Sequence, residues 1–417
     1  MSPEVECRPD DVVVTGLGTV NPLGADVETT WSALHQGTCA VRTLEHEWVG
    51  HHELPVRIGA PLAVDPAEML PPRQMRRLDR ASQCALLAAR QAWEQAEAPQ
   101  VAPQRLAVSV SPGMGPVLSV MEAWDTLRDK GPRRVLPTAV PALMPNAPAA
   151  AVGIELGAHG GIHAPVSACA SGAEAIAYGA DLIALGRADV VVAGGTDSAL
   201  HPMTVAAFGA MRALSTRNDD PQTASRPFAP DRDGFVLGEG AGLLVLERAA
   251  HATARGAQVL AVLAGSGVTA DAYDVARPEP SGAEQERALR LALDRAGLDA
   301  GAVGHVNAHA TSTPAGDVVE AGVLARTVPS AAVSATKSAT GHLLGGAGGL
   351  EAVLTVMALQ ERWAPPTLLP AGVDPELARL GLNVVGPQGR ALPQLEAAAS
   401  TSFGFGGHNV ALLLTRQ

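Results

Sequence analysis

The chain has 417 residues, a formal net charge of −12 at pH 7, and 47% hydrophobic residues with only 3% aromatic ones. This length exceeds what one ordinary hydrophobic core supports, so two halves or one large layered unit is expected. The negative charge disfavours general nucleic-acid binding. The acidic N-terminus MSPEVECRPDD lacks an apolar core, and no stretch approaches ~18 apolar residues, so we expect no signal peptide, no membrane span and a cytoplasmic location.

Strands and helices alternate along the chain, which predicts a layered α/β fold. The predicted strands cover residues 11–20, 106–110, 188–194, 242–247, the stretch from 259, 305–308 and 409–414. The predicted helices cover residues 26–37, 78–95, the stretch after 169, 251–256, 284–296, the stretch from 317 and 345–359. The pattern restarts near residue 258, which predicts an N-terminal half (1–255) and a C-terminal half (256–417). No sequence repeat is strong enough to demonstrate a duplication.

Two familiar binding motifs are incomplete. The glycine pair in TGLG lacks the third glycine of a dinucleotide loop, because Asn21 stands at that position. The segment DRDGFVLGEG begins like a calcium loop, but Phe235 replaces an oxygen ligand and no glutamate follows at the twelfth position. We expect no metal, and a structural network of ion pairs at this turn.

One cysteine stands where an enzyme would place a nucleophile. Cys169 follows an apolar approach in PVSACASG and precedes a helical pattern, so its thiol is expected at a helix N-terminus, where the thiolate is favoured. The alternative is a buried thiol that serves as a small hydrophobic group. The four cysteines lie far apart and predict no disulfide framework: Cys7, Cys39, Cys84 and Cys169.

Three further segments place chemically active side chains in turns rich in small residues. VNAHATSTPAGD carries His309, SATKSATGHLLGGAGG carries Lys337 and His342, and STSFGFGGHN is a glycine hinge around Phe403. Each has an ordinary alternative: a hydrogen-bonded core histidine, a solvent-facing lysine, a tight turn. All three nevertheless lie at strand–loop or loop–helix junctions, where layered α/β folds build their sites.

Basic residues gather in PPRQMRRLDRAS and KGPRR against the acidic background. They form either solvated surface or a docking site for an acidic partner. The residues are Arg73, Arg76, Arg77 and Arg80 in the first segment, and Lys130, Arg133 and Arg134 in the second.

In order and spacing, SACASG, NAHATSTPAGD, TKSATGHLLGGAGG and SFGFGGHN resemble the signature segments of the β-ketoacyl-[acyl-carrier-protein] synthases, most closely the elongating type II branch. The resemblance covers nearly the whole chain after about residue 11. It implies a thiolase-like fold with two similar αβαβα-layered halves, and a homodimer. The N-terminal half would carry the nucleophile Cys169, and the C-terminal half would carry His309, Lys337 and His342.

The resemblance also implies a reaction. Cys169 would accept an acyl chain, with the backbone N–H groups of Cys169 and Phe403 as the oxyanion hole. His309 and His342 would stabilise the enolate left by decarboxylation of a malonyl thioester, and Lys337 would support them electrostatically. The product would be a 3-oxoacyl chain two carbons longer. No resident cofactor is implied, because phosphopantetheine arrives on the acyl carrier protein.

The remaining roles implied by the resemblance concern binding and support. Thr311 and Thr313 would bind the pantetheine arm, and Phe403 would gate the acyl pocket. Met114 would limit the acyl chain. The remaining expected contributors are Ala276 and Phe405 as substrate-binding residues, Asp317 and Glu351 as supporting residues, and Arg73, Arg76, Arg77, Arg133, Arg134 and Arg212 as the docking site for the carrier protein.

Departures from the family pattern are few. Ala310 replaces a common glycine and Thr401 a common asparagine, while Asp274 and Ala276 replace a histidine and a small or hydroxylated residue. The last two flank the expected pantetheine entrance, so ligand preference or inhibitor sensitivity is expected to differ there.

Four other functions are alternatives to this one. Biosynthetic thiolases need a second cysteine that the region after residue 390 lacks, and initiating synthases use a Cys–His–Asn set. A non-catalytic chain-length-factor-like subunit would lack Cys169. A ketosynthase of a type II polyketide or other specialised pathway stays open.

Overall fold

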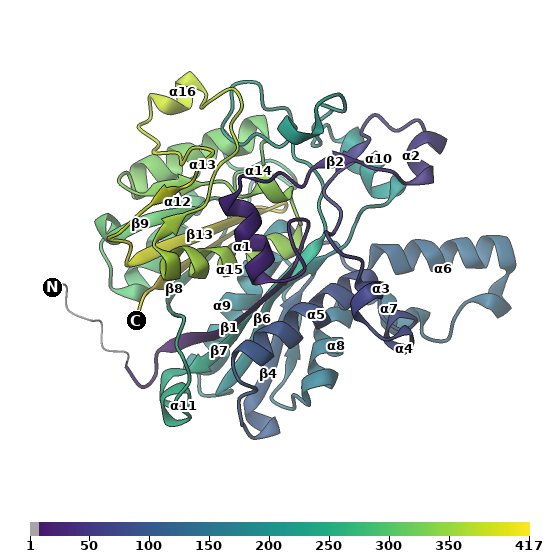
Figure 1. Ribbon diagram of the computed structural model, residues 1–417, viewed down its shortest axis with the longest axis horizontal. Coiled ribbons are helices and arrows are strands. Elements are labelled where there is room, and N and C mark those ends of the chain that lie inside the picture. Colours follow the sequence, from purple (N-terminus) through teal and green to yellow (C-terminus); the bar gives the residue numbers. More distant parts are fainter. Residues whose placement is uncertain (1–7) are drawn as a thin grey trace.

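A large mixed sheet forms the centre of the computed structural model, which describes residues 8–417 (Figure 1). The acidic segment 1–7, with Cys7, lies outside the described residues. The ten strands follow the order β10-β9-β13-β14-β8-β1-β7-β6-β4-β5. Their bounds are β1 (Val12–Val20), β4 (Leu106–Ser111), β5 (Ile162–His163), β6 (Val190–Asp197), β7 (Gly240–Arg248), β8 (Ala261–Ala270), β9 (Val303–Asn307), β10 (Ala332–Ser334), β13 (Ala397–Gly404) and β14 (His408–Thr415).

The sheet consists of two five-stranded halves with the same order. Residues before 255 contribute β1-β7-β6-β4-β5 and residues after it contribute β8-β14-β13-β9-β10, and both have antiparallel inner and parallel outer pairs. The halves meet where β1 pairs with β8, with Val13 opposite Val262. The structure thus reveals a repeat that the sequence did not. The domain boundary at 255, between α11 (Ala249–Ala254) and β8, stays a prediction, because the sheet crosses it.

In the first strand of each half, glycines let one helix pack closely against the strand. A Cβ on Gly18 of β1 would lie 1.9 Å from the carbonyl oxygen of Ala88 in α5 (Arg80–Gln95). A Cβ on Gly267 of β8 would likewise lie 1.9 Å from the carbonyl oxygen of Ala288 in α12 (Ala283–Ala296). The glycines of TGLG therefore serve close packing of a helix on a strand.

Helices cover both faces of each half-sheet. The helices α9 (Ser171–Ala184) and α15 (Gly345–Glu361) share one hydrophobic core with strands of both halves and lie between them. Outside, α5 and α8 (Ala147–Leu156) cover the first half, and α12 and α13 (Pro314–Thr327) cover the second. The layers therefore run α-β-α-β-α, and the predicted α/β class is confirmed (Figure 1).

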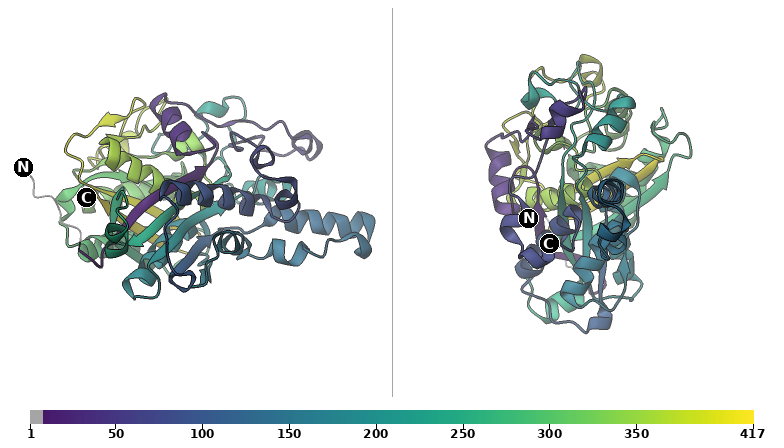
Figure 2. Two further views of the ribbon diagram at one scale, coloured as in Figure 1. Left: turned by 60° about the horizontal axis from the view of Figure 1, so that its bottom comes forward. Right: turned by 90° about the vertical axis from the view of Figure 1, so that its right-hand side faces the viewer.

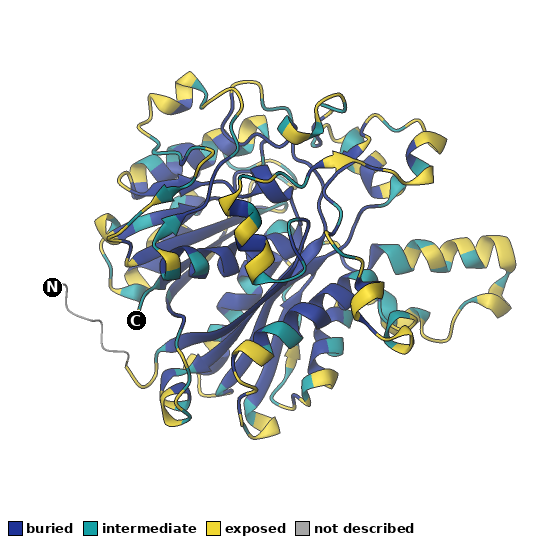
Figure 3. Cartoon of the chain, in the orientation of Figure 1, coloured by how far each residue is buried: buried dark blue, intermediate teal, exposed yellow. Residues whose placement is uncertain are grey.

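An arm that the sequence analysis did not predict projects from the first half. It contains α6 (Val117–Lys130) and α7 (Ala139–Leu143), and it extends to the right of the main body (Figures 1 and 2). Large apolar side chains are exposed on it, among them Trp124 at 57% and Leu136 at 60% (Figure 3). The arm has no hydrophobic core of its own in which these side chains are buried.

The remaining elements are short or peripheral. None of the helices within residues 8–417 has the length and apolar character needed to cross a bilayer. The two small strand pairs are β2 (Arg42–Thr43) with β3 (Ile58–Gly59) and β11 (Trp363–Ala364) with β12 (Arg390–Ala391). The other helices are α1 (Val27–His35), α2 (Glu47–His51), α3 (Pro66–Met69), α4 (Pro72–Met75), α10 (Pro202–Ala210), α14 (Lys337–Thr340) and α16 (Pro375–Ala378).

Candidate active site

Loops from both halves meet at Cys169. The residue lies in a single 3-10 turn, Ala168–Ala170, between β5 and the first turn of α9. Gly404 of β13 packs directly against this turn, because a Cβ on it would lie 2.4 Å from the carbonyl oxygen of Ser167 and 3.3 Å from the amide nitrogen of Cys169. The glycine hinge is thus required for the second half to reach the thiol.

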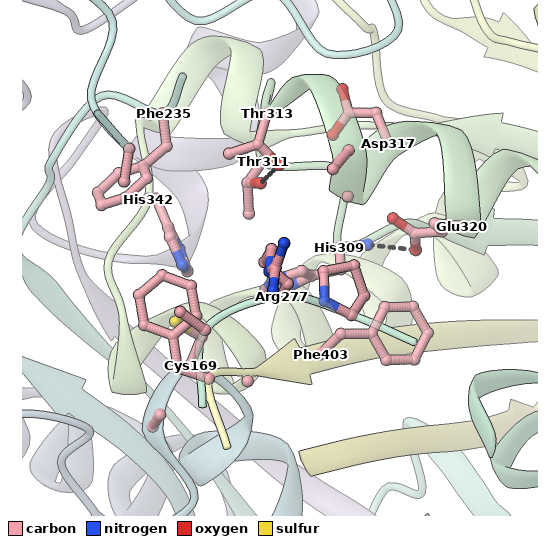
Figure 4. A pocket seen from close by; sticks show the side chains of 18 of the residues that line it. Cys169, Phe235, Arg277, His309, Thr311, Thr313, Asp317, Glu320, His342 and Phe403 are labelled. Atoms are coloured by element: carbon pink, nitrogen blue, oxygen red, sulfur yellow. Dashed lines mark hydrogen bonds between the residues drawn. The ribbon is translucent and has the colours of Figure 1, made fainter. Parts of the chain in front are cut away.

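One cavity of about 430 Å³ collects most of the predicted site (Figure 4). Two predicted residues, Lys337 and Glu351, are buried beside it and do not line it. The predicted residues that do line it are Met114, Cys169, Arg212, Ala276, His309, Thr311, Thr313, Asp317, His342, Phe403 and Phe405.

The thiol of Cys169 is protonated at neutral pH. Although the residue is partly open to the cavity, burial raises its pKa to about 12, against the lowering effect of the Lys337 charge. The expectation that the helix N-terminus would favour the thiolate is therefore wrong for the site without a bound ligand. Desolvation by the apolar surroundings outweighs the nearby N–H groups and the positive charge.

The backbone amide beside the sulfur belongs to Phe405. The N–H groups of Phe405 and of Cys169 itself hydrogen-bond toward the sulfur and lower the pKa of the thiol. Phe403 instead pairs with Asn409 in the β13–β14 ladder, and its ring meets that of His309 edge-on at 5.9 Å. The amide beside the sulfur is therefore that of Phe405, two residues after the Phe403 amide that the sequence predicted for the oxyanion hole.

The two histidines point into the cavity with free ring nitrogens (Figure 4). Their rings lie 5.4 Å apart and nearly perpendicular. Burial, followed by the nearby Lys337 charge, holds the pKa of both His309 and His342 well below its usual range, so both are neutral. Among residues 8–417, Nδ1 of His309 and both ring nitrogens of His342 have no hydrogen-bond partner. These orphaned polar atoms are suited to a ligand oxygen.

A buried ion pair lies next to the histidines. Lys337 in α14 pairs with Glu351 in α15, and both side chains are almost fully buried. Burial raises the pKa of Glu351 to about 7, and Lys337 opposes that rise. The ammonium charge lowers the pKa values of Cys169, His309 and His342 alike. Lys337 is therefore placed to act on the cavity through its charge.

Glu320, which no sequence motif indicated, fixes the loop that carries His309. Its carboxylate accepts hydrogen bonds from the backbone N–H of His309 (2.8 Å) and of Ala310 (2.6 Å), and from the hydroxyl of Thr401 (2.7 Å). Thr401 therefore fits at its unusual position. Glu320 lies three residues after Asp317 on α13, and that helical spacing was a usable signal.

A second missed carboxylate, Asp197, ends β6. It accepts hydrogen bonds from the backbone N–H groups of Gly113 and Gly345, both at 2.8 Å, and from that of Met114 at 3.2 Å. The loop that carries Met114 is thereby tied to the N-terminus of α15, where a negative charge is favourable. Its only sequence signal is an acidic residue at the end of a buried strand.

The predicted threonines and Asp317 lie on one loop. The hydroxyl oxygens of Thr311 and Thr313 are 3.1 Å apart, and both residues line the cavity. Asp317 accepts hydrogen bonds from the backbone N–H groups of Phe228 (2.9 Å) and Ser312 (3.1 Å), and burial raises its pKa to about 7. Asp317 therefore holds this loop against the segment at residue 228.

The basic residues separate into two groups. Arg76, Arg77 and Arg134 line a second hollow of about 1020 Å³ between the segment 75–78, at the end of α4, and the projecting arm. Arg73 lies in α4 beside them, and Arg133 in the turn Pro132–Arg134. Arg212 instead lines the cavity of Cys169. Arg80 is turned inward to Glu239, with Nε 3.0 Å from Oε2, so it does not belong to the exposed cluster.

The Asp/Arg turn forms the predicted ion-pair network. Arg226 is buried and pairs with Asp231 at 3.2 Å and Asp233 at 3.0 Å, and Arg217 also contacts Asp231. Within residues 8–417, no three His, Cys, Asp or Glu side chains gather in a metal-binding geometry.

Comparisons with known proteins match both halves of the chain. The family models "Beta-ketoacyl synthase, N-terminal domain" and "Beta-ketoacyl synthase, C-terminal domain" cover residues 9–252 and 260–369. The chain belongs to the β-ketoacyl synthase family. The 3-oxoacyl-[acyl-carrier-protein] synthase 2 of Mycobacterium tuberculosis (strain H37Rv) is 42% identical to this synthase over 97% of both chains, and that of Vibrio cholerae is 40% identical over 97% and 99%.

Solved structures agree with this assignment. A β-ketoacyl synthase from Burkholderia phymatum STM815 matches this synthase with a TM-score of 0.90 and 37% identity over 98% and 99% of the two chains. A type II polyketide ketosynthase, solved with its acyl-carrier protein and a hexaketide (AntDE:AntF), matches with a TM-score of 0.89 and 27% identity over 98% and 100%. The expected thiolase-like ketosynthase fold is confirmed.

Proposed function

We propose that this synthase is a 3-oxoacyl-[acyl-carrier-protein] synthase II, an acyltransferase that elongates fatty acids by decarboxylative Claisen condensation. The carrying observation is a thiol and two neutral imidazoles around one cavity, with ring nitrogens that have no partner within residues 8–417. The names of relatives 40–42% identical over nearly the full length support the same reaction.

In the first step the thiol of Cys169 attacks the thioester of acyl-carrier protein. A sulfur–carbon bond forms at Cys169, the bond to the pantetheine sulfur breaks, and the thiol proton passes to the departing thiolate. The N–H groups of Cys169 and Phe405 stabilise the oxyanion of the tetrahedral intermediate. Because the thiol is protonated at rest, a neutral histidine nitrogen is needed to carry its proton.

In the second step a malonyl thioester loses CO₂. The bond to the carboxylate carbon breaks, and its electron pair remains as an enolate on the thioester. Two neutral imidazoles donate N–H hydrogen bonds to that oxygen, which strengthen as its negative charge develops. Lys337 contributes its positive charge without a covalent role, and Glu351 holds the ammonium in place.

The carbanion then attacks the acyl group on Cys169. A carbon–carbon bond forms, the sulfur–carbon bond breaks, and the negative charge of the former carboxylate ends on the cysteine sulfur. A thiolate with a pKa of about 12 takes up a proton from water, which restores the thiol for the next cycle. The released 3-oxoacyl chain is two carbons longer and remains on the carrier.

The other lining residues have binding roles. Thr311 and Thr313 hydrogen-bond the pantetheine arm, and Met114 limits the depth available to the acyl chain. Phe403 packs on His309 and, with Phe405, gates the step from acylation to condensation. Ala276 lines the entrance, and Asp317 supports the threonine loop.

The partner is an acidic acyl carrier protein, which brings its own phosphopantetheine, so no resident cofactor is needed. A solved relative is described as an acyl-carrier protein in complex with its ketosynthase, which supports this partner. Local basic patches can attract an acidic partner despite the net negative charge. The synthase acts as a cytoplasmic homodimer in this proposal. The docking residues are Arg73, Arg76, Arg77, Arg133, Arg134 and Arg212.

A ketosynthase of a type II polyketide or other specialised pathway is the second candidate. The same residues would serve it, and two polyketide-type ketosynthase structures match with TM-scores of 0.89 and 0.87, although at 27% identity. A chain-length-factor-like subunit is disfavoured because Cys169 is present and open to the cavity.

A condensation assay with acyl- and malonyl-carrier protein tests the proposal. Cys169→Ala and His342→Ala are each expected to reduce chain extension by about 10³-fold or more. Extension that survives both substitutions would contradict the assignment. Varying the acyl chain in the wild type separates fatty-acid from polyketide substrates.

A further inference from the structure

The loop between β8 and α12 forms part of the rim of the active-site cavity. Ala276, Arg277 and Pro278 line it, and Arg212 lines it from the first half. Arg277 is labelled in Figure 4. The loop is fastened to the glycine hinge at two points. The N–H of Asp271 donates to the carbonyl of Gly407 at 2.8 Å, and that of Gly406 donates to the carbonyl of Val275 at 2.9 Å. A side chain on this loop therefore has a fixed place relative to Cys169.

Asp274 orients Arg277. One carboxylate oxygen accepts the backbone N–H groups of Ala276 (2.9 Å) and Arg277 (3.0 Å), and the other accepts Nη2 of the guanidinium at 3.0 Å. The Arg277 side chain is nevertheless 74% exposed. Its Nη1 has no hydrogen-bond partner anywhere in residues 8–417. The guanidinium is thus pre-oriented at the rim, and the N–H groups of Nη1 remain available as hydrogen-bond donors.

We propose that Arg277 binds the phosphate of the phosphopantetheine arm and makes the synthase selective for phosphorylated over unphosphorylated pantetheine thioesters. The inference rests on the proposed function. The thioester must reach Cys169 inside the cavity, so the phosphate at the far end of the arm lies toward the rim.

Charge and geometry both favour phosphate at this place. The chain carries a formal net charge of −12, yet two arginines, Arg212 and Arg277, line this one cavity. A guanidinium presents paired N–H groups that match two phosphate oxygens, which a lysine ammonium cannot reproduce. Asp274 offsets part of the positive charge, but its own oxygens are already engaged by the backbone and by Nη2.

The nearby acidic groups do not compete for the free Nη1. Asp271 accepts hydrogen bonds from the side-chain amide of Asn409 (2.7 Å) and from the N–H of Glu279 (3.0 Å). Glu279 itself accepts from the N–H and hydroxyl of Ser281. The phosphate is a monoanionic diester on the carrier protein and a monoester of up to two negative charges in free phosphopantetheine. In either form it encounters the guanidinium as the available partner on this loop.

The test measures acylation of Cys169 by two small thioesters, an acyl-pantetheine and the same acyl-phosphopantetheine, with no carrier protein present. This isolates the phosphate from acidic side chains on the carrier. The wild type is expected to show a KM about tenfold lower for the phosphorylated substrate, as one charge-assisted contact supplies. Arg277→Ala is expected to abolish the difference, and Arg277→Lys to keep part of it, with the rate at saturation unchanged.

Arg287→Ala is the matched control. Arg287 also pairs with a carboxylate three residues away, Glu284 at 2.7 Å, and is 54% exposed, but it does not line the cavity. Its variant should keep the full preference. The inference is overturned if the wild type uses both thioesters equally, if Arg277→Ala retains the preference, or if Arg287→Ala loses it equally. A wild type that neither thioester nor acyl-carrier protein can acylate would instead overturn the proposed function itself.

Discussion

The two halves of this synthase use one scaffold for different chemistry. In the first half, the chain leaves the edge strand β5, passes Cys169 and enters the central helix α9. In the second half, it leaves the edge strand β10, passes Lys337 and His342, and enters the central helix α15. The proposed nucleophile and the proposed charge-stabilising groups Lys337 and His342 thus occupy equivalent places in the topology. The cavity lies where these two places face each other.

The halves differ most in their connections. Between β13 and β14 only residues 405–407 intervene, whereas residues 198–239, with α10, intervene between β6 and β7. Between β4 and β5 the first half also carries the arm with α6 and α7. The second half therefore has the shorter connection beside the cavity, and the first half carries the longer insertions.

The largest expected effect on stability comes from the rigid half. Lys337→Met removes one partner of the buried pair with Glu351 and should destabilise the fold by about 3–5 kcal/mol. Denaturant unfolding measures this. The double variant Lys337→Met with Glu351→Leu should recover part of the loss, because it leaves no unpaired buried charge. A single variant as stable as the wild type would show that the pair is not desolvated as described.

Because the two halves are equivalent, substitution of corresponding glycines should lower the free energy of unfolding by similar amounts. Gly18→Ala and Gly267→Ala each force a Cβ to within 1.9 Å of a helix carbonyl oxygen, so each should destabilise by about 3 kcal/mol. Gly301→Ala is the control, since open space surrounds that position and the change should be near neutral. If only one of the two strand variants unfolds more easily, the helix–strand contact is not shared by the halves.

A smaller effect concerns pH. The pKa of Asp317 is raised to about 7 by burial, so the native state holds a proton that the unfolded chain has already lost. This stability is fully present below about pH 4 and is lost as the pH rises through about 7. Between pH 6 and 8 the unfolding free energy should fall by about 1.4 kcal/mol from this group alone.

Asp317→Asn should remove the part of the pH dependence of the unfolding free energy that comes from Asp317. Asp197 and Glu351, whose pKa values are also raised to about 7, should keep a dependence of the same sign. Unfolding curves at pH 6, 7 and 8 for both proteins measure the difference. Equal slopes would mean that Asp317 is ionised throughout.

Strands with a regular apolar pattern and residues within recognisable motifs could be predicted from the sequence. The run VVVTGLGTV became β1, and the motif residues Cys169, His309 and His342 came together as expected. The arm at α6 was not predicted, because its apolar side chains, such as Trp124, face solvent. The amide of Phe405 beside the sulfur is a backbone feature, invisible in residue types. Glu320 and Asp197 were missed because their partners are backbone N–H groups of residues distant in sequence.

The pKa of Cys169 could not be predicted either, since it depends on how completely the folded loops exclude water. The same holds for the inward turn of Arg80, which depends on Glu239, a residue far along the chain.

In the proposed mechanism, the first half holds the acyl group on Cys169 and the second half carries out its condensation; this division is tested most directly by the intact mass of the protein. Wild type and His309→Ala are each incubated with acyl-carrier protein, and malonyl-carrier protein is then added. Both should gain one acyl group, located on Cys169, and only the wild type should lose it to a 3-oxoacyl product. An acyl group located on a residue other than Cys169, or discharge by the His309→Ala variant at the wild-type rate, would contradict this division.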